Sequence, residues 1–217
     1  MNIFLRKTPS HVELVFPEEQ KMSPIWVDFM RNDLVLRGQN RHSKKELLLR
    51  AVGVKKNVAL TVIDATAGWG RDGFLLANAG CYVMLIERSP WMAALLQDGL
   101  ERFWKIQDKI TADCFNLIQA DAINYLNTLS ENYPEVIYLD PMYPVRTKSA
   151  LVKKEMRVLR EIVGSDQDSG LLFLIALKKA KQRVVVKRDI RSDFLEGKKP
   201  SYQYLGKDTR FDVYLLT

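Results

Sequence analysis

The segment Asp140-Pro141-Met142-Tyr143 combines side chains that suit chemistry on an amine attached to an aromatic ring. It follows the apolar run 135–139, which predicts a short buried strand. The carboxylate and the carbonyls of the turn can accept hydrogen bonds from the amine, while the tyrosine ring stacks on the base that carries it. Because the nitrogen lone pair is delocalised into the ring, an activated electrophile must be held in line with it. Asp140, Pro141 and Tyr143 are therefore the candidate catalytic residues, although Asp-Pro also begins ordinary turns.

A glycine-containing segment upstream, residues 64–73, predicts a site for the donor of that electrophile. The β-branched run 59–64 indicates a buried strand, and the helical pattern of 71–78 follows it directly. Gly68 and Gly70 allow the backbone to approach a ligand closely and to point free N–H groups at it. The spacing of Gly68, Gly70 and Gly73 also fits the dinucleotide fingerprint, so a nicotinamide-dependent oxidoreductase is an alternative. Asp64 disfavours a pyrophosphate and suits S-adenosylmethionine, which carries an ammonium and a sulfonium.

Two further acidic residues follow short apolar runs. Glu87 ends the run 82–87 and could bind both ribose hydroxyls, and Asp121 ends the run 116–121 and could contact adenine together with the Ala122 backbone. A helix N-cap or a solvated loop acid is the alternative for either residue alone. Ligands bind beyond the carboxyl ends of the strands in an open α/β sheet. The four strand ends, at Asp64, Glu87, Asp121 and Asp140, are therefore expected to converge on one crevice.

The order of the expected elements indicates how these strand ends are positioned. From about residue 58, strand and helix patterns alternate, which is typical of a doubly wound, mostly parallel sheet. Ser89 is expected to cap a helix that begins at Pro90. Further elements are helices near 149–162 and 169–179, a strand at 183–187 and a closing pair of strands at 202–205 and 211–216. Residues 58–217 therefore form the expected main domain.

Residues 1–57 are expected to form a small β-rich element on that domain. Alternating patterns at 11–16, 25–29 and 33–36 predict short strands, with a turn at 32–33. A helix is predicted over 43–52.

Eight segments spread over nearly the whole chain resemble the RsmJ-type 16S ribosomal RNA (guanine-N2)-methyltransferases. They are residues 27–29, 64–72, 85–88, 93–100, 138–144, 148–157, 183–188 and 210–214. The segment 148–157 is more specific than any generic methyltransferase motif. The resemblance implies a Rossmann-like class I methyltransferase fold with a C-terminal antiparallel hairpin. It also implies S-adenosylmethionine as donor and one guanine near the 3′ end of small-subunit ribosomal RNA as acceptor.

The resemblance assigns contacts with the donor as well. The residues it implies are Arg71, Asp72, Glu87, Arg88, Asp121, Ala122 and Asp140. The match of Asp121-Ala122 is by position, because the family has a pair of serines there. Asp64, Gly68 and Gly70 complete the predicted cofactor site.

The charge of the chain favours a polyanionic partner. The net charge is +7, and basic residues concentrate in segments 41–56, 146–160 and 178–210. The second segment directly follows the proposed catalytic turn, where an RNA backbone must pass. Phosphate contacts of this kind set affinity and register, although a basic run is also commonly a solvated face. The predicted RNA-binding residues are Arg146, Lys148, Lys153, Lys154, Arg157, Lys187 and Arg188.

The composition of the chain limits the classes of protein to which it can belong. A hydrophobic content of 47% and a charged content of 27% describe an ordinary globular protein, and no apolar run approaches the roughly 20 residues of a membrane helix. Cys81 and Cys114 form no Cys-x-x-Cys pair, and His11 and His42 are isolated, so no metal site is expected. The first residues lack the pattern of an export signal, which favours a cytoplasmic location. The sequence does not indicate an oligomeric state.

The residues thus favour direct methyl transfer to the amine, with no covalent enzyme intermediate, since neither cysteine has a nucleophile context. An adenine-N6 methyltransferase would use nearly the same Asp-Pro-x-aromatic segment, so it is an alternative. A non-catalytic RNA-binding protein is another, and it would bind RNA without the methyl donor.

Overall fold

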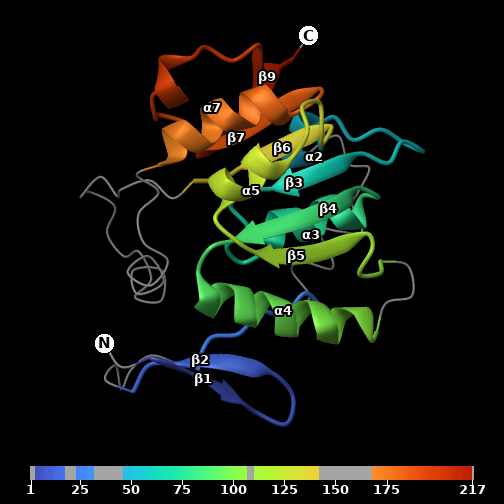
Figure 1. The fold of residues 1–217 in the computed structure, drawn as a ribbon, viewed down its shortest axis with the longest axis vertical. Helices are drawn as coiled ribbons and strands as arrows, with labels where there is room; N and C mark the ends of the chain where they lie inside the picture. Colours follow the sequence, from blue (N-terminus) through green and yellow to red (C-terminus); the bar gives the residue numbers. More distant parts are fainter. Residues whose placement is uncertain (1–2, 18–22, 32–45, 107–109, 142–167, 217) are drawn as a thin grey trace.

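The computed structural model describes residues 3–17, 23–31, 46–106, 110–141 and 168–216 (Figure 1). Nine strands form two sheets within these residues. The small sheet pairs β1 (Phe4–Lys7) antiparallel to β2 (Val12–Val15). The large sheet has the order β5-β4-β3-β6-β7-β9-β8, in which β5 to β7 run parallel and β9 runs antiparallel to both of its neighbours. Its strands are β3 (Thr61–Asp64), β4 (Tyr82–Glu87), β5 (Phe115–Gln119), β6 (Val136–Leu139), β7 (Arg183–Asp189), β8 (Tyr202–Leu205) and β9 (Thr209–Leu215).

Helices cover both faces of the large sheet. In Figure 1, α5 and α7 lie in front of the sheet, and α2 and α3 lie behind it. The described helices are α2 (Leu47–Val52), α3 (Arg71–Asn78), α4 (Pro90–Trp104), α5 (Ala122–Thr128) and α7 (Ser169–Lys179), with a 3-10 turn η1 (Leu195–Gly197). A predominantly parallel sheet between two helical layers, closed by an antiparallel hairpin, confirms the predicted fold class.

The alternation of side chains along each strand divides the interior into two cores. Val62 and Tyr138 face α2, α3 and α4, whereas the adjacent Ile63 and Ile137 face α5 and α7. All four are at most 1% exposed. Strands buried on both faces read as continuous apolar runs, as these do in the sequence. Each fully buried aliphatic side chain contributes about 1.5–3 kcal/mol to folding.

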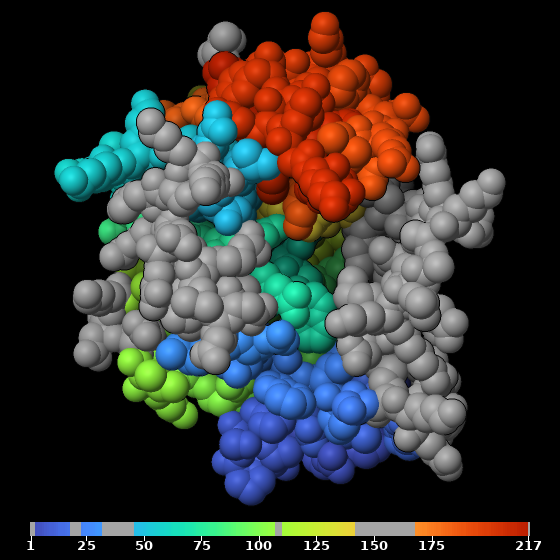
Figure 2. All heavy atoms as spheres, turned by 180° about the vertical axis from the view of Figure 1, so that it is seen from behind, coloured from blue at the N-terminus to red at the C-terminus, as the bar shows by residue number. Residues whose placement is uncertain are grey.

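The N-terminal residues share the first of these cores. Phe29 is 1% exposed, and its ring lies 5.4 Å from both the Phe74 ring of α3 and the Phe115 ring of β5. Leu14 of β2 is fully buried in the same cluster. Figures 1 and 2 place this N-terminal part at the opposite end of the molecule from the C-terminal strands. The division of the chain at residue 57 stays a prediction, but the described N-terminal residues have no core of their own.

The predicted strand at 25–29 is wrong. Only Ile25 pairs, through an isolated bridge to Leu14, and the chain turns at Phe29-Met30. The Asp28 carboxylate accepts a hydrogen bond from the Met30 N–H at 2.9 Å. Such local bonds from aspartate compete with strand pairing.

The other predicted elements differ from the structure mainly at their ends. The helix predicted over 43–52 is described from Leu47, with Glu46 before it. The strand predicted over 116–121 ends at Gln119, because Asp121 instead caps α5. Ser89 caps α4, and Pro90 is its first residue, as predicted. The predicted elements at 33–36 and 149–162 and the predicted turn at 32–33 lie outside the described residues.

No helix in the described ranges has both the length and the apolar character needed to cross a membrane.

Candidate active site

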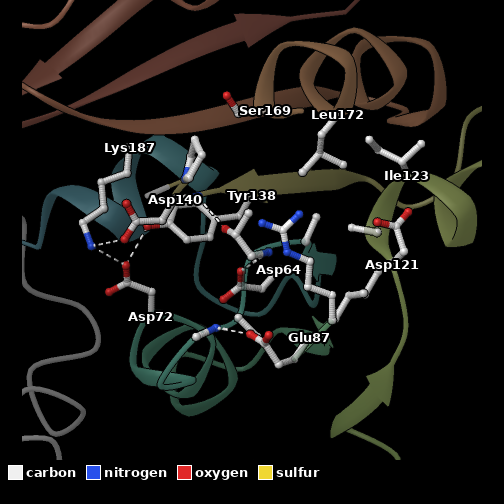
Figure 3. A pocket seen from close by; sticks show the side chains of 18 of the residues that line it. Asp64, Asp72, Glu87, Asp121, Ile123, Tyr138, Asp140, Ser169, Leu172 and Lys187 are labelled. Carbon is white, nitrogen blue, oxygen red and sulfur yellow. Dashed lines mark hydrogen bonds and ion pairs between the residues drawn. The ribbon is translucent and has the colours of Figure 1, made fainter. Parts of the chain in front are cut away.

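The candidate site lies at the carboxyl edge of the large sheet, where the strand order reverses. β3 pairs with β4 on one side and with β6 on the other, and a crevice opens at such a point in α/β sheets. A cavity of about 380 Å³ occupies this position (Figure 3). The predicted residues that line it are Asp64, Gly68, Arg71, Asp72, Glu87, Arg88, Asp121, Ala122, Asp140, Pro141 and Lys187. The structure therefore brings the four acidic residues, Asp64, Glu87, Asp121 and Asp140, together around one cavity, although Asp121 lies at the start of α5 and not at a strand end.

The loop after β3 forms one wall of the cavity, and its backbone N–H groups are bonded to the end of β4 and within the loop itself. The Ala67 N–H donates to the Ile86 carbonyl at 3.1 Å, and the Gly68 N–H donates to Glu87 Oε2 at 3.0 Å. The Gly70 N–H donates to the Ala67 carbonyl at 2.7 Å. The expectation that Gly68 and Gly70 point free N–H groups at a ligand is therefore wrong. A cradle for a pyrophosphate is not formed by these three groups.

Gly70 has a different function from the one expected, because it does not line the cavity. Its φ of 68° is in the left-handed region, and a Cβ at this position would lie 2.8 Å from Leu96 Cδ2. Glycine is needed here for the turn that begins α3 and for the close packing of that turn on α4.

Asp64, the last residue of β3, contributes a buried carboxyl group to the lining of the cavity. Its residue is 1% exposed, and Oδ1 accepts a hydrogen bond from the Thr66 N–H at 3.2 Å. Burial first, and then the neighbouring Asp72 carboxylate, raises the pKa of Asp64 to about 8. A cation bound beside it would favour the ionised form. In its ionised form, this buried carboxylate would attract the ammonium or sulfonium of S-adenosylmethionine and repel a phosphate.

Asp140 and Lys187 lie beside each other because of the sheet register. Leu139 at the end of β6 pairs with Val186 of β7, so Asp140 and Lys187 follow at the same level. Lys187 Nζ lies 2.7 Å from Asp140 Oδ2 and 2.8 Å from Asp72 Oδ2 (Figure 3).

Two more hydrogen bonds tie this group to the cavity wall. The Tyr138 hydroxyl donates to Asp72 Oδ2 at 2.6 Å, and the Asp140 N–H donates to Thr66 Oγ1 at 2.6 Å. Burial, reinforced by the neighbouring carboxylates, raises the pKa of Tyr138 well above its ordinary value, so the hydroxyl stays a donor. The network therefore joins the predicted catalytic carboxylate to β3, α3, β6 and β7.

Glu87 lies at the end of β4 and is 4% exposed. Besides the bond from Gly68, its Oε1 accepts from the Ser89 N–H at 2.8 Å. The residue therefore orders the loop after β3 and the start of α4 while it lines the cavity.

Replacing Glu87 by alanine is expected to weaken donor affinity by about 10- to 100-fold, since hydrogen bonds to a charged group contribute about 1.5–3 kcal/mol. The maximal rate should change less, because the predicted ribose contact would be remote from the sulfur and similar in the ground and transition states. Calorimetry with S-adenosylhomocysteine and steady-state kinetics measure the two effects. Glu101→Ala, on the exposed face of α4, is the control. A fall in the rate constant at unchanged affinity would contradict this role.

Asp121, Arg88 and Arg71 have partners within the protein as well as positions at the cavity. Asp121 Oδ1 accepts from the Asn124 N–H at 2.8 Å, which confirms the N-cap alternative while the residue lines the cavity. Arg88 Nη1 lies 3.1 Å from Asp168 Oδ2, which ties the end of β4 to the start of α7. The Arg71 guanidinium lies 5.7 Å from the Trp69 ring centroid.

Only two of the predicted RNA-binding residues, Lys187 and Arg188, lie within the described part of the chain. Tyr143, Arg146, Lys148, Lys153, Lys154 and Arg157 lie outside the described residues. Arg188 is 6% exposed and donates to the Asp193 carbonyl, so the prediction that it contacts phosphate does not agree with its burial. Lys187 lies in the cavity between two carboxylates instead of on an outer surface. The basic excess of segment 178–210 therefore comes partly from internal residues.

Several residues of the cavity were not predicted from the sequence. They are Ala65, Thr66, Ala67, Trp69, Ile86, Ala120, Ile123, Tyr138, Asp168, Ser169 and Leu172. Ile123 of α5, beside Asp121, and Leu172 of α7 add apolar side chains to the lining of the cavity (Figure 3). The alternation along β6 could have indicated that Tyr138 points to the face opposite Leu139. No local signal identifies the start of α7, which reaches the cavity only through tertiary packing.

The described part of the chain was also compared with the ligand groups that metal ions require. Among the described residues, no group of three or more His, Cys, Asp and Glu side chains could hold a metal ion. Cys81 is buried outside the cavity, and burial raises the pKa of its thiol to about 11.

The fold and the acidic cavity define an S-adenosylmethionine-dependent methyltransferase. Residues 1–216 match the family described as "Putative SAM-dependent methyltransferase". A solved SAM-dependent methyltransferase from Neisseria gonorrhoeae has 34% identity and a TM-score of 0.75, covering 98% of this chain and 82% of its own. The chain is thus an enzyme with S-adenosylmethionine as its cofactor, which excludes the nicotinamide-dependent and non-catalytic alternatives.

Curated relatives identify the family more narrowly. A protein of Coxiella burnetii (strain Dugway 5J108-111) is 49% identical over 209 residues, covering 96% of this chain and 82% of its own. One of Nitrosococcus oceani is 48% identical over 216 residues, with coverages of 98% and 84%. One of Haemophilus influenzae is 44% identical over 213 residues, with coverages of 97% and 82%. All three are named ribosomal RNA small subunit methyltransferase J, and this chain belongs to that family.

Proposed function

We propose that this enzyme transfers a methyl group from S-adenosylmethionine to the exocyclic N2 of one guanine near the 3′ end of small-subunit ribosomal RNA. The observation that carries the proposal is the position of Asp140 and Pro141. They leave β6 at the edge of the same cavity that holds Asp64 and Glu87. The relatives named for methylation of small-subunit ribosomal RNA support RNA as the substrate.

The donor would be held by residues that line the cavity. Asp64 would face its positive charge, Glu87 its ribose hydroxyls, and Asp121 with Ala122 its adenine edge. The cavity residues Gly68, Arg71, Asp72 and Arg88 complete the proposed site. When bound, the donor supplies a methyl group on a positively charged sulfur.

The acceptor amine would be oriented by Asp140 and the Pro141 carbonyl, and Tyr143 would stack on the base after the base leaves its helix. Base–aromatic stacking contributes about 1–3 kcal/mol, which offsets part of the cost of unstacking. The amine nitrogen forms a bond to the methyl carbon as the carbon–sulfur bond breaks, and it then loses one proton. Holding the poor nucleophile in line accounts for much of the acceleration. A covalent enzyme intermediate is not required.

The RNA backbone would be bound by the basic residues that follow the catalytic turn. Arg146, Lys148, Lys153, Lys154 and Arg157 are proposed to contact phosphates and so to set affinity and register. A substrate of this kind would place the enzyme in the cytoplasm, where ribosomal subunits are assembled.

Mass spectrometry of nuclease-digested small-subunit RNA tests the proposal. RNA from cells that lack the protein should have lost one N2-methylguanosine near the 3′ end, and the wild-type gene should restore it. The Asp140→Ala gene should not restore it, which separates catalysis from a role in RNA binding. If the RNA from cells that lack the protein has instead lost an N6-methyladenosine, the result would support the adenine-N6 methyltransferase alternative. Unchanged RNA would reject the proposed substrate.

A further inference from the structure

Lys187 occupies a position that neither the donor contacts nor the RNA contacts explain. It belongs to β7, and its ammonium lies between Asp140, which follows β6, and Asp72, which begins α3 (Figure 3). The side chain is 28% exposed, and it lines the donor cavity. An ammonium with two carboxylates within 2.8 Å is already neutralised and is a poor phosphate ligand.

The groups that face Lys187 are predominantly acidic. β6 contributes Tyr138 and the Asp140 that follows it, α3 contributes Asp72, and β3 contributes Asp64. The neighbour of Lys187 on β9 is Phe211, which is uncharged. Burial alone would lower the pKa of Lys187, but the Asp72 and Asp140 carboxylates raise it above its ordinary value. The ammonium therefore stays charged throughout the range in which the enzyme can be assayed.

Three carboxyl groups in one cavity oppose one another's ionisation. At Asp64, burial is the main cause that raises the pKa to about 8, and the Asp72 carboxylate adds to it. Asp140 must accept a hydrogen bond from the amine, and a protonated carboxyl would instead compete as a donor. A fixed cation in contact with Asp140 favours the ionised form and restricts the orientation of the carboxylate.

We propose that Lys187 is a positioning residue that holds Asp140 ionised and oriented toward the acceptor amine, and thereby sets the lower pH limit of methyl transfer. The inference rests on the proposed function of Asp140 and extends it to a residue of the neighbouring strand. Lys187 touches neither the donor nor the base in this proposal. It acts through the Asp140 carboxylate.

The test is the pH dependence of kcat for wild-type enzyme and Lys187→Met, with small-subunit RNA and S-adenosylmethionine at saturation. At pH 7 the variant is expected to lose about 100-fold in kcat, chiefly because the Asp140 carboxylate is no longer held in one orientation. The acidic limb of its pH–rate profile should also move upward by at least about one pH unit, because the carboxylates lose the adjacent positive charge of Lys187. The part of the loss that comes from protonation of Asp140 should therefore disappear as the pH rises. Lys187→Arg keeps the positive charge, so the acidic limb of its pH–rate profile should lie at the same pH as in wild type.

Lys179→Met is the matched control, since Lys179 is also partly buried and donates to the Leu129 carbonyl, but lies outside the cavity. It should keep the wild-type profile. If Lys187→Met does not fold, the double variant Asp72→Asn/Lys187→Met is used, because it also removes the negative charge of Asp72. Its pH–rate profile is compared with that of Asp72→Asn alone. The acidic limb of the double variant should still lie at the higher pH.

A second readout is independent of turnover. Binding of S-adenosylhomocysteine by calorimetry between pH 6 and 9 should release or take up protons differently in Lys187→Met and in wild type, because the acidic groups of the cavity then titrate without the fixed positive charge of Lys187 beside them. Unchanged proton linkage together with an unshifted acidic limb would overturn the inference, even if the rate falls. Such a result would mean that Lys187 only supports the fold.

The two proposals fail in different ways. Wild-type enzyme that forms no N2-methylguanosine contradicts the proposed acceptor, and the pH comparison is then made on whichever base amine is methylated. If the wild-type enzyme methylates guanine and the pH–rate profile of Lys187→Met is unshifted, the proposed acceptor is supported. The proposed role of Lys187 is then rejected.

Discussion

Asp140→Ala is expected to lower the rate of methyl transfer by about 10³-fold, equivalent to about 4 kcal/mol of transition-state stabilisation. The variant loses the carboxylate that would orient the amine, and Lys187 would then neutralise only Asp72. Affinity for the donor should fall much less than the rate. Single-turnover assays with small-subunit RNA measure the rate, and calorimetry with S-adenosylhomocysteine measures donor affinity.

The fold of Asp140→Ala should remain intact. The Asp140 side chain is 39% exposed, and partly exposed ion pairs contribute only about 0–1 kcal/mol to stability. Asp98→Ala is a suitable control, because Asp98 pairs with Arg102 at 2.9 Å on α4 outside the cavity. Near-normal turnover by folded Asp140→Ala would remove Asp140 from the mechanism.

Asp64→Asn is expected to stabilise the donor-free protein at alkaline pH while weakening donor binding by about 100-fold. The pKa of Asp64 is about 8 in the folded protein and about 3.9 in an unfolded chain. Between these values the folded state holds a proton that the unfolded state has released, so stability falls as the pH rises from about 4 to 8. Asparagine cannot ionise and avoids this loss, which amounts to at most about 6 kcal/mol.

Thermal unfolding at two pH values checks the stability of Asp64→Asn. At pH 8.5 the variant should unfold at least about 5 °C above wild type, and at pH 5 the difference should be several-fold smaller, because only about one of the roughly four pH units between the two pKa values has then been crossed. The increase in Tm on adding S-adenosylmethionine should be smaller in the variant at both values. An equal difference in Tm at pH 5 and pH 8.5 would show that the ionisation of Asp64 is not its cause.

The site was predictable to the extent that its residues follow local patterns. Asp64, Glu87 and Asp140 each end an apolar run, and the common rule for α/β sheets places such residues at one edge. The predicted fold class follows from the same runs and from the helical patterns between them. The sequence also indicated the cap at Ser89, because serine before proline begins helices.

The remaining features depend on tertiary contacts that a local pattern does not contain. Lys187 and Arg188 were both assigned to RNA, although adjacent strand residues point to opposite faces. Their roles differ because β7 lies beside β6, which places Lys187 next to Asp140 and buries Arg188 near Asp193. The strand at 25–29 failed for the opposite reason, since a purely local bond at Asp28 ended the extended chain.

The hydrogen bond from the Asp140 N–H to Thr66 Oγ1 joins two turns that are 74 residues apart in the sequence. One turn belongs to the half of the crevice that would receive the sulfonium, and the other belongs to the half that would receive the nucleobase. Because a single threonine hydroxyl connects them, a shift of one turn away from the other would break this hydrogen bond, at a cost of about 0.5–1.5 kcal/mol. In the proposed complex the bond would therefore help to set the spacing between the departing sulfur and the incoming nitrogen before either reactant arrives.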